Sequence, residues 1–191
     1  MSASTRARSV RSRASASRRS ASAARASADF APAFRIARHA GLAGVPHGGE
    51  LLGPEHVRDV VAHLKPARLG HGVRSAEDPE LLARLVDAGV ALEVCPSSNV
   101  SLGVYHDAGD VPLRTLLDAG ARVALGADDP LLFLSRLNDQ YRVAREDHGL
   151  DDAALASLAR SSIDVSLASE TSKRAMLADV DAWLAAPVMV G

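Results

Sequence analysis

Residues 78–99 read DPELLARLVDAGVALEVCPSSN, a stretch that predicts one helix followed by one strand. Asp78 is a favourable N-cap, Pro79 suits the first helical position, and Gly89 is typical of a helix C-terminus. The leucines and the valine between them recur at helical spacing, so the helix has one apolar face. The apolar run at 90–95 that follows predicts a buried strand.

The same alternation of helix and strand continues on both sides of this stretch. Three further apolar runs each end at a polar residue: 42–46 at His47, 68–70 at His71, and 122–127 at Asp128-Asp129. Helices that begin at the prolines of positions 54 and 112 separate them, and helices are expected at 131–148, 152–167 and 171–184. Four successive strand–helix units with short loops predict parallel strands joined by right-handed crossovers.

Two architectures contain such units, a doubly wound open sheet and part of a (β/α)8 barrel. A dinucleotide-binding open sheet needs Gly-x-Gly-x-x-Gly after its first strand, and Gly48-Gly49-Glu50 does not supply it. In a barrel, catalytic groups follow the C-terminal ends of several strands, and three of the four apolar runs here end at His or Asp. The sequence therefore favours part of a barrel.

The composition is that of a globular protein, with 47% hydrophobic and 24% charged residues. Cys95 is the single cysteine, so no intrachain disulfide can form, which is typical of a reducing compartment. No apolar run reaches the roughly 20 residues that a membrane span needs. We expect a soluble, cytoplasmic protein without a membrane partner.

The first 28 residues differ from the rest. They hold seven of the 22 basic residues and none of the 23 acidic ones, and they consist almost wholly of Ser, Ala and Arg, which predicts a disordered leader before a domain at 29–191. Three interpretations compete: an organelle transit peptide, a nucleic-acid-binding tail, and an extension without function, for example from a misplaced start codon. The abrupt change near Asp29 favours the third, so nucleic acid is not the expected partner.

His47 and Glu50 are the first candidates for chemistry. A histidine at a strand end can bind a metal ion, and a glutamate just beyond it can exchange protons at the same C-terminal end of the strands. Taken alone, either residue is better explained as part of a turn. His71, between Gly70 and Gly72, has a similar alternative as a half-buried structural histidine.

Asp128 and Asp129 are the second candidate pair. Two adjacent carboxylates at the end of an apolar strand are costly unless each has a partner. One could bind a metal ion while the other contacts a substrate. For Asp129 the alternative is a helix N-cap before Pro130. Cys95 is expected to pack as a small apolar side chain in its strand.

Four motifs, in this order, resemble the adenosine deaminase family of amidohydrolase-type barrels. They are HGGE at 47–50, RLGHG at 68–72, LEVCPSSN at 92–99 and ADDP at 127–130, and the resemblance extends over about 30–184. It implies an α/β fold, the C-terminal half of a (β/α)8 TIM-type barrel with about four parallel strands plus helices. A whole barrel takes about 250 residues.

The resemblance also implies a reaction, the zinc-dependent hydrolytic deamination of adenosine to inosine and ammonia in purine metabolism. Zn2+ would be the cofactor and a purine nucleoside the partner. The resemblance implies that His47 and Asp128 are zinc ligands and that Glu50 is the proton shuttle to purine N1. It implies that His71 orients or helps activate the zinc-bound water. In the purine pocket it places Gly48 and Gly49, with Asp129 sharing a hydrogen bond with N7.

Two departures from the family pattern affect these expectations. Gly48 stands where alanine is more usual, and no two of the seven histidines form the His-x-His pair that supplies two further zinc ligands. Two ligands should bind zinc weakly, because protein zinc sites use three or four. We therefore expect a truncated product whose activity alone is uncertain.

The alternative is a non-catalytic fragment or interaction module that completes a barrel with another chain. Open strand edges would then favour self-association. In either case, we expect His47 and Asp128 to face a common cation at the open end of adjoining strands.

Overall fold

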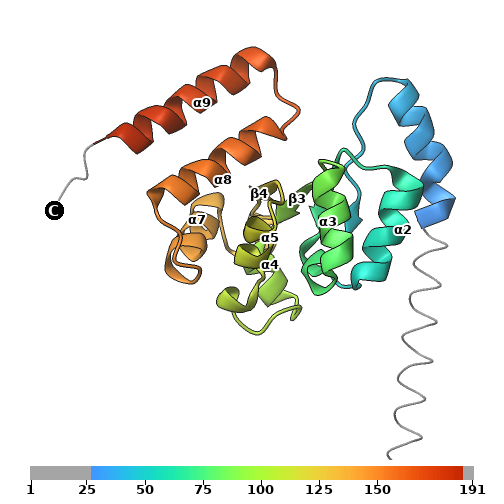
Figure 1. The fold of residues 1–191 in the computed structure, drawn as a ribbon, viewed down its shortest axis with the longest axis horizontal. Helices are drawn as coiled ribbons and strands as arrows, with labels where there is room; N and C mark the ends of the chain where they lie inside the picture. Colours follow the sequence, from blue (N-terminus) through green and yellow to red (C-terminus); the bar gives the residue numbers. More distant parts are fainter. Residues whose placement is uncertain (1–26, 187–191) are drawn as a thin grey trace, which may run out of the picture.

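The computed structural model describes residues 27–186, so most of the predicted leader lies outside the described residues (Figure 1). Four parallel strands form one sheet in the order of the sequence. The strands are β1 (His47–Gly48), β2 (Arg68–His71), β3 (Ala91–Val94) and β4 (Val123–Leu125). The predicted parallel sheet of four strand–helix units is confirmed.

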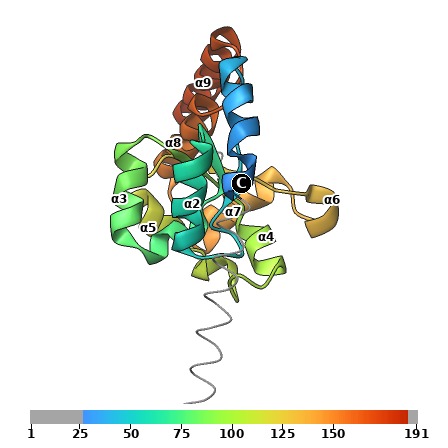
Figure 2. The same ribbon diagram turned by 90° about the vertical axis from the view of Figure 1, so that its right-hand side faces the viewer.

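Helices connect and flank the strands (Figures 1 and 2). A first helix covers 27–39 and so includes the predicted boundary at 28/29. The others are α2 (Pro54–Leu64), α3 (Pro79–Asp87), α4 (Pro96–Ser101), α5 (Leu113–Asp118), α6 (Pro130–Phe133), α7 (Leu137–Glu146), α8 (Asp152–Asp164) and α9 (Glu170–Ala185), with short 3-10 turns at Val73–Glu77 (η1) and Ala108–Asp110 (η2).

The two faces of the sheet differ because side chains alternate along each strand. Leu69, Leu92 and Val94 point to one face, which α2, α3 and α5 cover to form the apolar core. Glu93 and Cys95 point to the other face. We call the first the helix-covered face and the second the inner face.

The predicted capping signals of α3 are present. The Asp78 carboxylate accepts a hydrogen bond from the Leu81 N–H at 3.0 Å, and Pro79 is the first helical residue. Gly89, just after the helix, has φ +67°, a conformation that glycine adopts without steric cost.

The first strand lies later in the chain than the predicted run at 42–46. The chain does run beside β2 from Gly44 onward, since Ala67 N–H donates to the Gly44 carbonyl and Gly70 N–H to the Pro46 carbonyl, each at 2.9 Å. Pro46 has no N–H to return such a bond. The regular ladder therefore forms only at His47–Gly48.

The predicted helix at 131–148 is wrong, because the chain forms α6 and α7 with a break between them. Leu134 has φ +52°, and the next residue, Ser135, is buried. The Ser135 hydroxyl accepts a hydrogen bond from the buried Gln140 side chain at 2.6 Å, and Gln140 Oε1 accepts one from Ser97 N–H at 3.1 Å. The break places Ser135 in this polar network, which ties α7 to α4.

Large apolar side chains are exposed along the flanks of the sheet. Segment α6 projects from the body (Figure 2), where Leu131 is 90% exposed and Leu134 is 89% exposed. Phe30 and Ile36, on the helix at 27–39, are exposed near the opposite edge. No helix within 27–186 combines the length and hydrophobicity required to cross a membrane.

Candidate active site

A cavity of about 300 Å³ opens on the inner face at the C-terminal ends of the strands, and we call its opening the mouth. Its lining comes from β1, β2 and β3 and from the residues that directly follow β3 and β4: His47, Gly70, His71, Glu93, Cys95, Gly126, Ala127 and Asp128. Three of the predicted site residues, His47, His71 and Asp128, therefore line one cavity.

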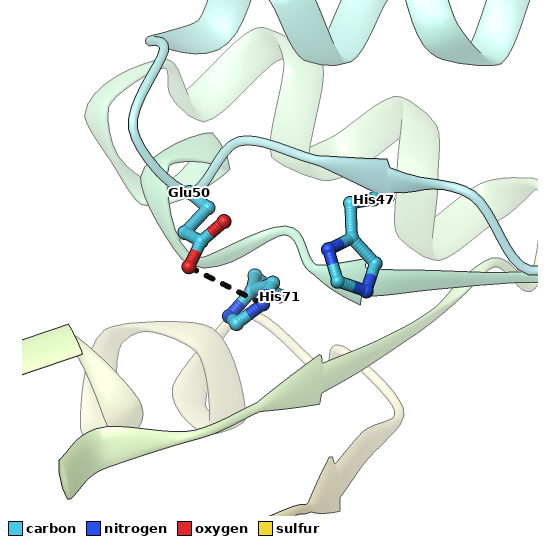
Figure 3. Close-up of side chains that lie close together, drawn as sticks. All are labelled: His47, Glu50 and His71. Atoms are coloured by element: carbon cyan, nitrogen blue, oxygen red, sulfur yellow. Dashed lines mark ion pairs between the residues drawn. The ribbon is translucent and has the colours of Figure 1, made fainter. Parts of the chain in front are cut away.

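His47 is positioned by the backbone of β2. A Cβ atom on Gly70 would lie only 2.3 Å from Cδ2 of the His47 ring, so the ring occupies space that any other residue at position 70 would fill. The imidazoles of His47 and His71 meet edge to face, with centroids 4.9 Å apart and planes at 83° (Figure 3). Gly70 thus allows two imidazoles to converge.

His71 lies at the centre of the site and is only 2% exposed. Its φ of +62° is rare for a residue with a side chain and turns the ring to the mouth of the sheet. Nε2 lies 3.5 Å from Glu50 Oε1 and 3.8 Å from Asp128 Oδ2. Burial holds the pKa of His71 below its usual value of 6.5, although both carboxylates act in the opposite direction. The imidazole is therefore neutral at neutral pH and can serve as a ligand.

Glu50 reaches His71 across the tight turn that follows β1 (Figure 3). Gly49 has φ +70°, and a Cβ there would lie 2.4 Å from Val57 Cγ2, so the turn requires glycine. A Cβ on Gly48 would meet its nearest neighbours at 3.4 Å, an ordinary contact. Position 48 could therefore accept the alanine that is more usual in the family pattern.

Asp128 follows β4 with φ +57° and contacts His71. Since β1 and β4 are the outer strands of the described sheet, the expectation that His47 and Asp128 lie on adjoining strands is wrong. Asp129 has the expected capping role, because its Oδ1 accepts hydrogen bonds from the N–H groups of Leu131 and Leu132 at 3.1 and 3.0 Å.

Sequence reasoning did not place two side chains, those of Glu93 and Cys95, on the inner face. Glu93 lines the cavity and lies 3.5 Å from the Arg68 guanidinium. Cys95 is buried as expected, and burial raises the pKa of its thiol to about 12, so the thiol stays protonated. The signal was available in the alternation of β3, which places residues 93 and 95 on the face opposite Leu92.

Two groups of described residues have donor atoms close enough to hold a metal ion. His47, Glu50 and His71 form one, with donor atoms all within 4.8 Å of one another, and Asp128 is not a member. His106, Asp107 and Asp110 form the other, which is fully on the surface. Two imidazoles and a carboxylate are a donor set that zinc accepts, so the residues at the mouth fit this metal.

Comparisons with known proteins point to one protein family. The family model for adenosine deaminase matches residues 6–183. A Streptomyces coelicolor protein named as an adenosine/adenine deaminase is 60% identical over 158 residues, which are 83% of this chain and 46% of the relative.

The crystal structure of an adenine deaminase from Arthrobacter aurescens superposes with a TM-score of 0.80 at 32% identity, covering 84% of this chain and 49% of that one. An amidohydrolase from Burkholderia ambifaria, whose structure has bound zinc, gives a TM-score of 0.72 at 25% identity, covering 81% of this chain and 44% of that one.

This chain spans about half the length of the curated relatives it matches. The expected fold, half of a (β/α)8 barrel, is confirmed by the match to about half of the longer barrel enzymes. Because the family model covers nearly all of the described residues, the chain belongs to the adenosine deaminase family.

Proposed function

We propose that the chain contributes the inner-face mouth to a zinc-dependent hydrolytic deamination that converts adenosine to inosine and ammonia. The observation that carries this proposal is the convergence of His47, Glu50, His71 and Asp128, from the ends of three different strands, at the mouth of the sheet. Residues 71 and 128 both have positive φ, and such strain is concentrated at functional sites.

His47 and Asp128 would hold the zinc ion, and zinc when bound supplies a water of lowered pKa. Glu50 would deliver a proton to purine N1, so that charge developing in the ring is neutralised as C6 becomes tetrahedral. His71, neutral and fixed by burial, would orient the attacking water. The backbone of Gly48 and Gly49 would face the base.

Asp129 would share a hydrogen bond with purine N7. Its Oδ1 caps the following helix, and Oδ2 is the oxygen that would meet the base. Asp129 directly follows Asp128 in the chain, and the cap holds its Oδ1 against the start of α6. This arrangement supports a role in orienting the base and leaves proton transfer to Glu50.

The test is product formation by the purified chain with zinc present. Adenosine and adenine are supplied separately, inosine and hypoxanthine are quantified by chromatography, and purine binding is measured by calorimetry. We expect Glu50→Gln to abolish product formation and Glu55→Gln, an exposed glutamate of α2, to leave it unchanged. Turnover that survives Glu50→Gln, or the absence of both turnover and purine binding, would contradict the proposal.

A further inference from the structure

The corner between α7 and α8 contains a buried histidine that the proposed deamination does not use. His148 is 8% exposed and lies between the end of α7 at Glu146 and the start of α8 at Asp152. Its backbone carbonyl accepts a hydrogen bond from Arg114 Nε of α5 at 2.7 Å, and the Gly149 carbonyl accepts one from Arg114 Nη2 at 2.9 Å. Arg114 therefore ties this corner to α5.

One ring nitrogen of His148 is hydrogen-bonded and the other is not. The ring donates a hydrogen bond to the backbone carbonyl of Ala108 in η2. Nε2 is buried and has no hydrogen-bond partner among the described residues, so Nδ1 is the donor and Nε2 is an unprotonated acceptor. The neutral imidazole in this tautomer holds the corner against η2.

A second proton on this ring has no acceptor in place. A buried N–H group without a partner is costly, because it has lost its hydrogen bonds to water. Burial lowers the pKa of His148 below its usual value of 6.5, and the Arg114 guanidinium lowers it further. The bond to Ala108 and the Asp147 carboxylate act in the opposite direction. The closed corner therefore favours the neutral ring.

The space for a second ring position lies directly beside the first. A cavity of about 350 Å³ is lined by His148 and by residues of η2, α5 and the corner, among them Asp110 and Asp147. Carboxylates form strong hydrogen bonds with a protonated imidazole. The acids at the start of α8 have other roles, since Asp151 caps the helix and Asp152 pairs with an arginine of α7.

We propose that His148 is an acid-sensitive latch at the α7–α8 corner. The neutral ring is bound to the Ala108 carbonyl and keeps the corner closed. When the ring takes a proton from solvent, it turns into the adjacent cavity, where Asp110 and Asp147 accept its N–H groups, and the corner is released from η2. This device lies outside the mouth and does not depend on the proposed function.

The sign of the pH dependence follows from the two states of the ring. In the closed corner the pKa of His148 is below 6.5, whereas in an opened corner the solvated ring returns to its usual value. The closed corner therefore binds fewer protons than the open one. Its stability is fully present above pH 6.5 and is lost as the pH falls below that value.

Two substitutions separate this latch from the other histidines. His148→Asn keeps an amide N–H near the position of Nδ1 and does not titrate. His106→Asn is the matched control, because His106 is exposed and its hydrogen bond to Asp107 raises its pKa. If His148→Asn does not fold, His148→Gln replaces it.

The readout is local to the corner. Leu150 N–H donates to the Ala144 carbonyl at 3.1 Å, so its hydrogen exchange reports opening of the corner. Exchange in the full chain is measured by NMR one pH unit above and one below 6.5, and is corrected for the intrinsic exchange rates. The imidazole C–H signals of both histidines are titrated in the same samples.

We expect protection of the Leu150 amide to fall about tenfold from the higher to the lower pH in the native chain and in His106→Asn. In His148→Asn we expect it to change less than about twofold. The His148 signal should titrate below pH 6.5 and the His106 signal above it. A His148 signal that titrates at or above 6.5, protection that does not fall in the native chain, or an equal fall in His148→Asn would overturn the proposal.

Discussion

The two faces of the sheet are built from alternate residues of the same short strands and serve opposite purposes. On the helix-covered face, Leu69, Leu92 and Val94 are buried beneath helices and stabilise the fold. On the inner face, His47, Glu93 and other polar groups surround a cavity that no core side chain fills. A one-residue shift of register would exchange these faces, so the pattern that stabilises the sheet also fixes which groups reach the mouth.

The largest expected effect compares two neighbours in β3. Leu92→Ala removes a side chain that is 0% exposed, so we expect a loss of about 2–5 kcal/mol in the free energy of unfolding, measured with urea. Glu93→Gln, on the other face, breaks a partly exposed ion pair with Arg68 and should cost about 1 kcal/mol or less. Equal losses in the free energy of unfolding would mean that the helix-covered face does not contribute more to stability than the inner face.

The next largest effect concerns Gly70, where the inner face has no side chain. Gly70→Ala places a methyl group 2.3 Å from the present position of the His47 ring, which must move away. We expect zinc affinity to fall about tenfold, equivalent to about 1.4 kcal/mol. The control is Gly109→Ala, whose methyl would lie 3.8 Å from its nearest neighbour. Unchanged zinc affinity in Gly70→Ala would show that contact with β2 does not position His47.

The smallest effect is expected at the edge of β4, where the two faces meet. The Ser162 hydroxyl, from α8, accepts a hydrogen bond from the Leu125 N–H at 3.3 Å and donates one to the Leu158 carbonyl at 3.0 Å. Ser162→Ala should cost about 0.5–1.5 kcal/mol and speed hydrogen exchange at the Leu125 amide. The exposed Ser157→Ala is the control. Unchanged exchange at Leu125 would indicate that α8 does not protect this edge.

Much of the helix-covered face could be predicted from sequence, because helix caps and apolar periodicity are local signals. The caps of α3 at Asp78 and Gly89 are examples. The break before α7 could not be predicted, since it depends on Ser97, which is distant in the chain from Ser135 and Gln140.

The candidate site was predictable in its members and not in its geometry. The motifs named His47, Glu50, His71 and Asp128, and three of these line one cavity. Nothing local indicated that residues 71 and 128 have positive φ, or that the donor atoms of Glu50 lie nearer to the imidazoles than those of Asp128. Both properties follow from how β1, β2 and β4 are arranged in space.

The most direct test of the whole account is the position of a bound metal ion. Crystals of the chain soaked with zinc, with data collected on both sides of the zinc absorption edge, would locate the ion by anomalous scattering. The account predicts a peak at the inner-face mouth, about 2.0–2.2 Å from a nitrogen of His47 and a carboxylate oxygen of Asp128. A peak only at His106, Asp107 and Asp110, or none at the mouth, would contradict it.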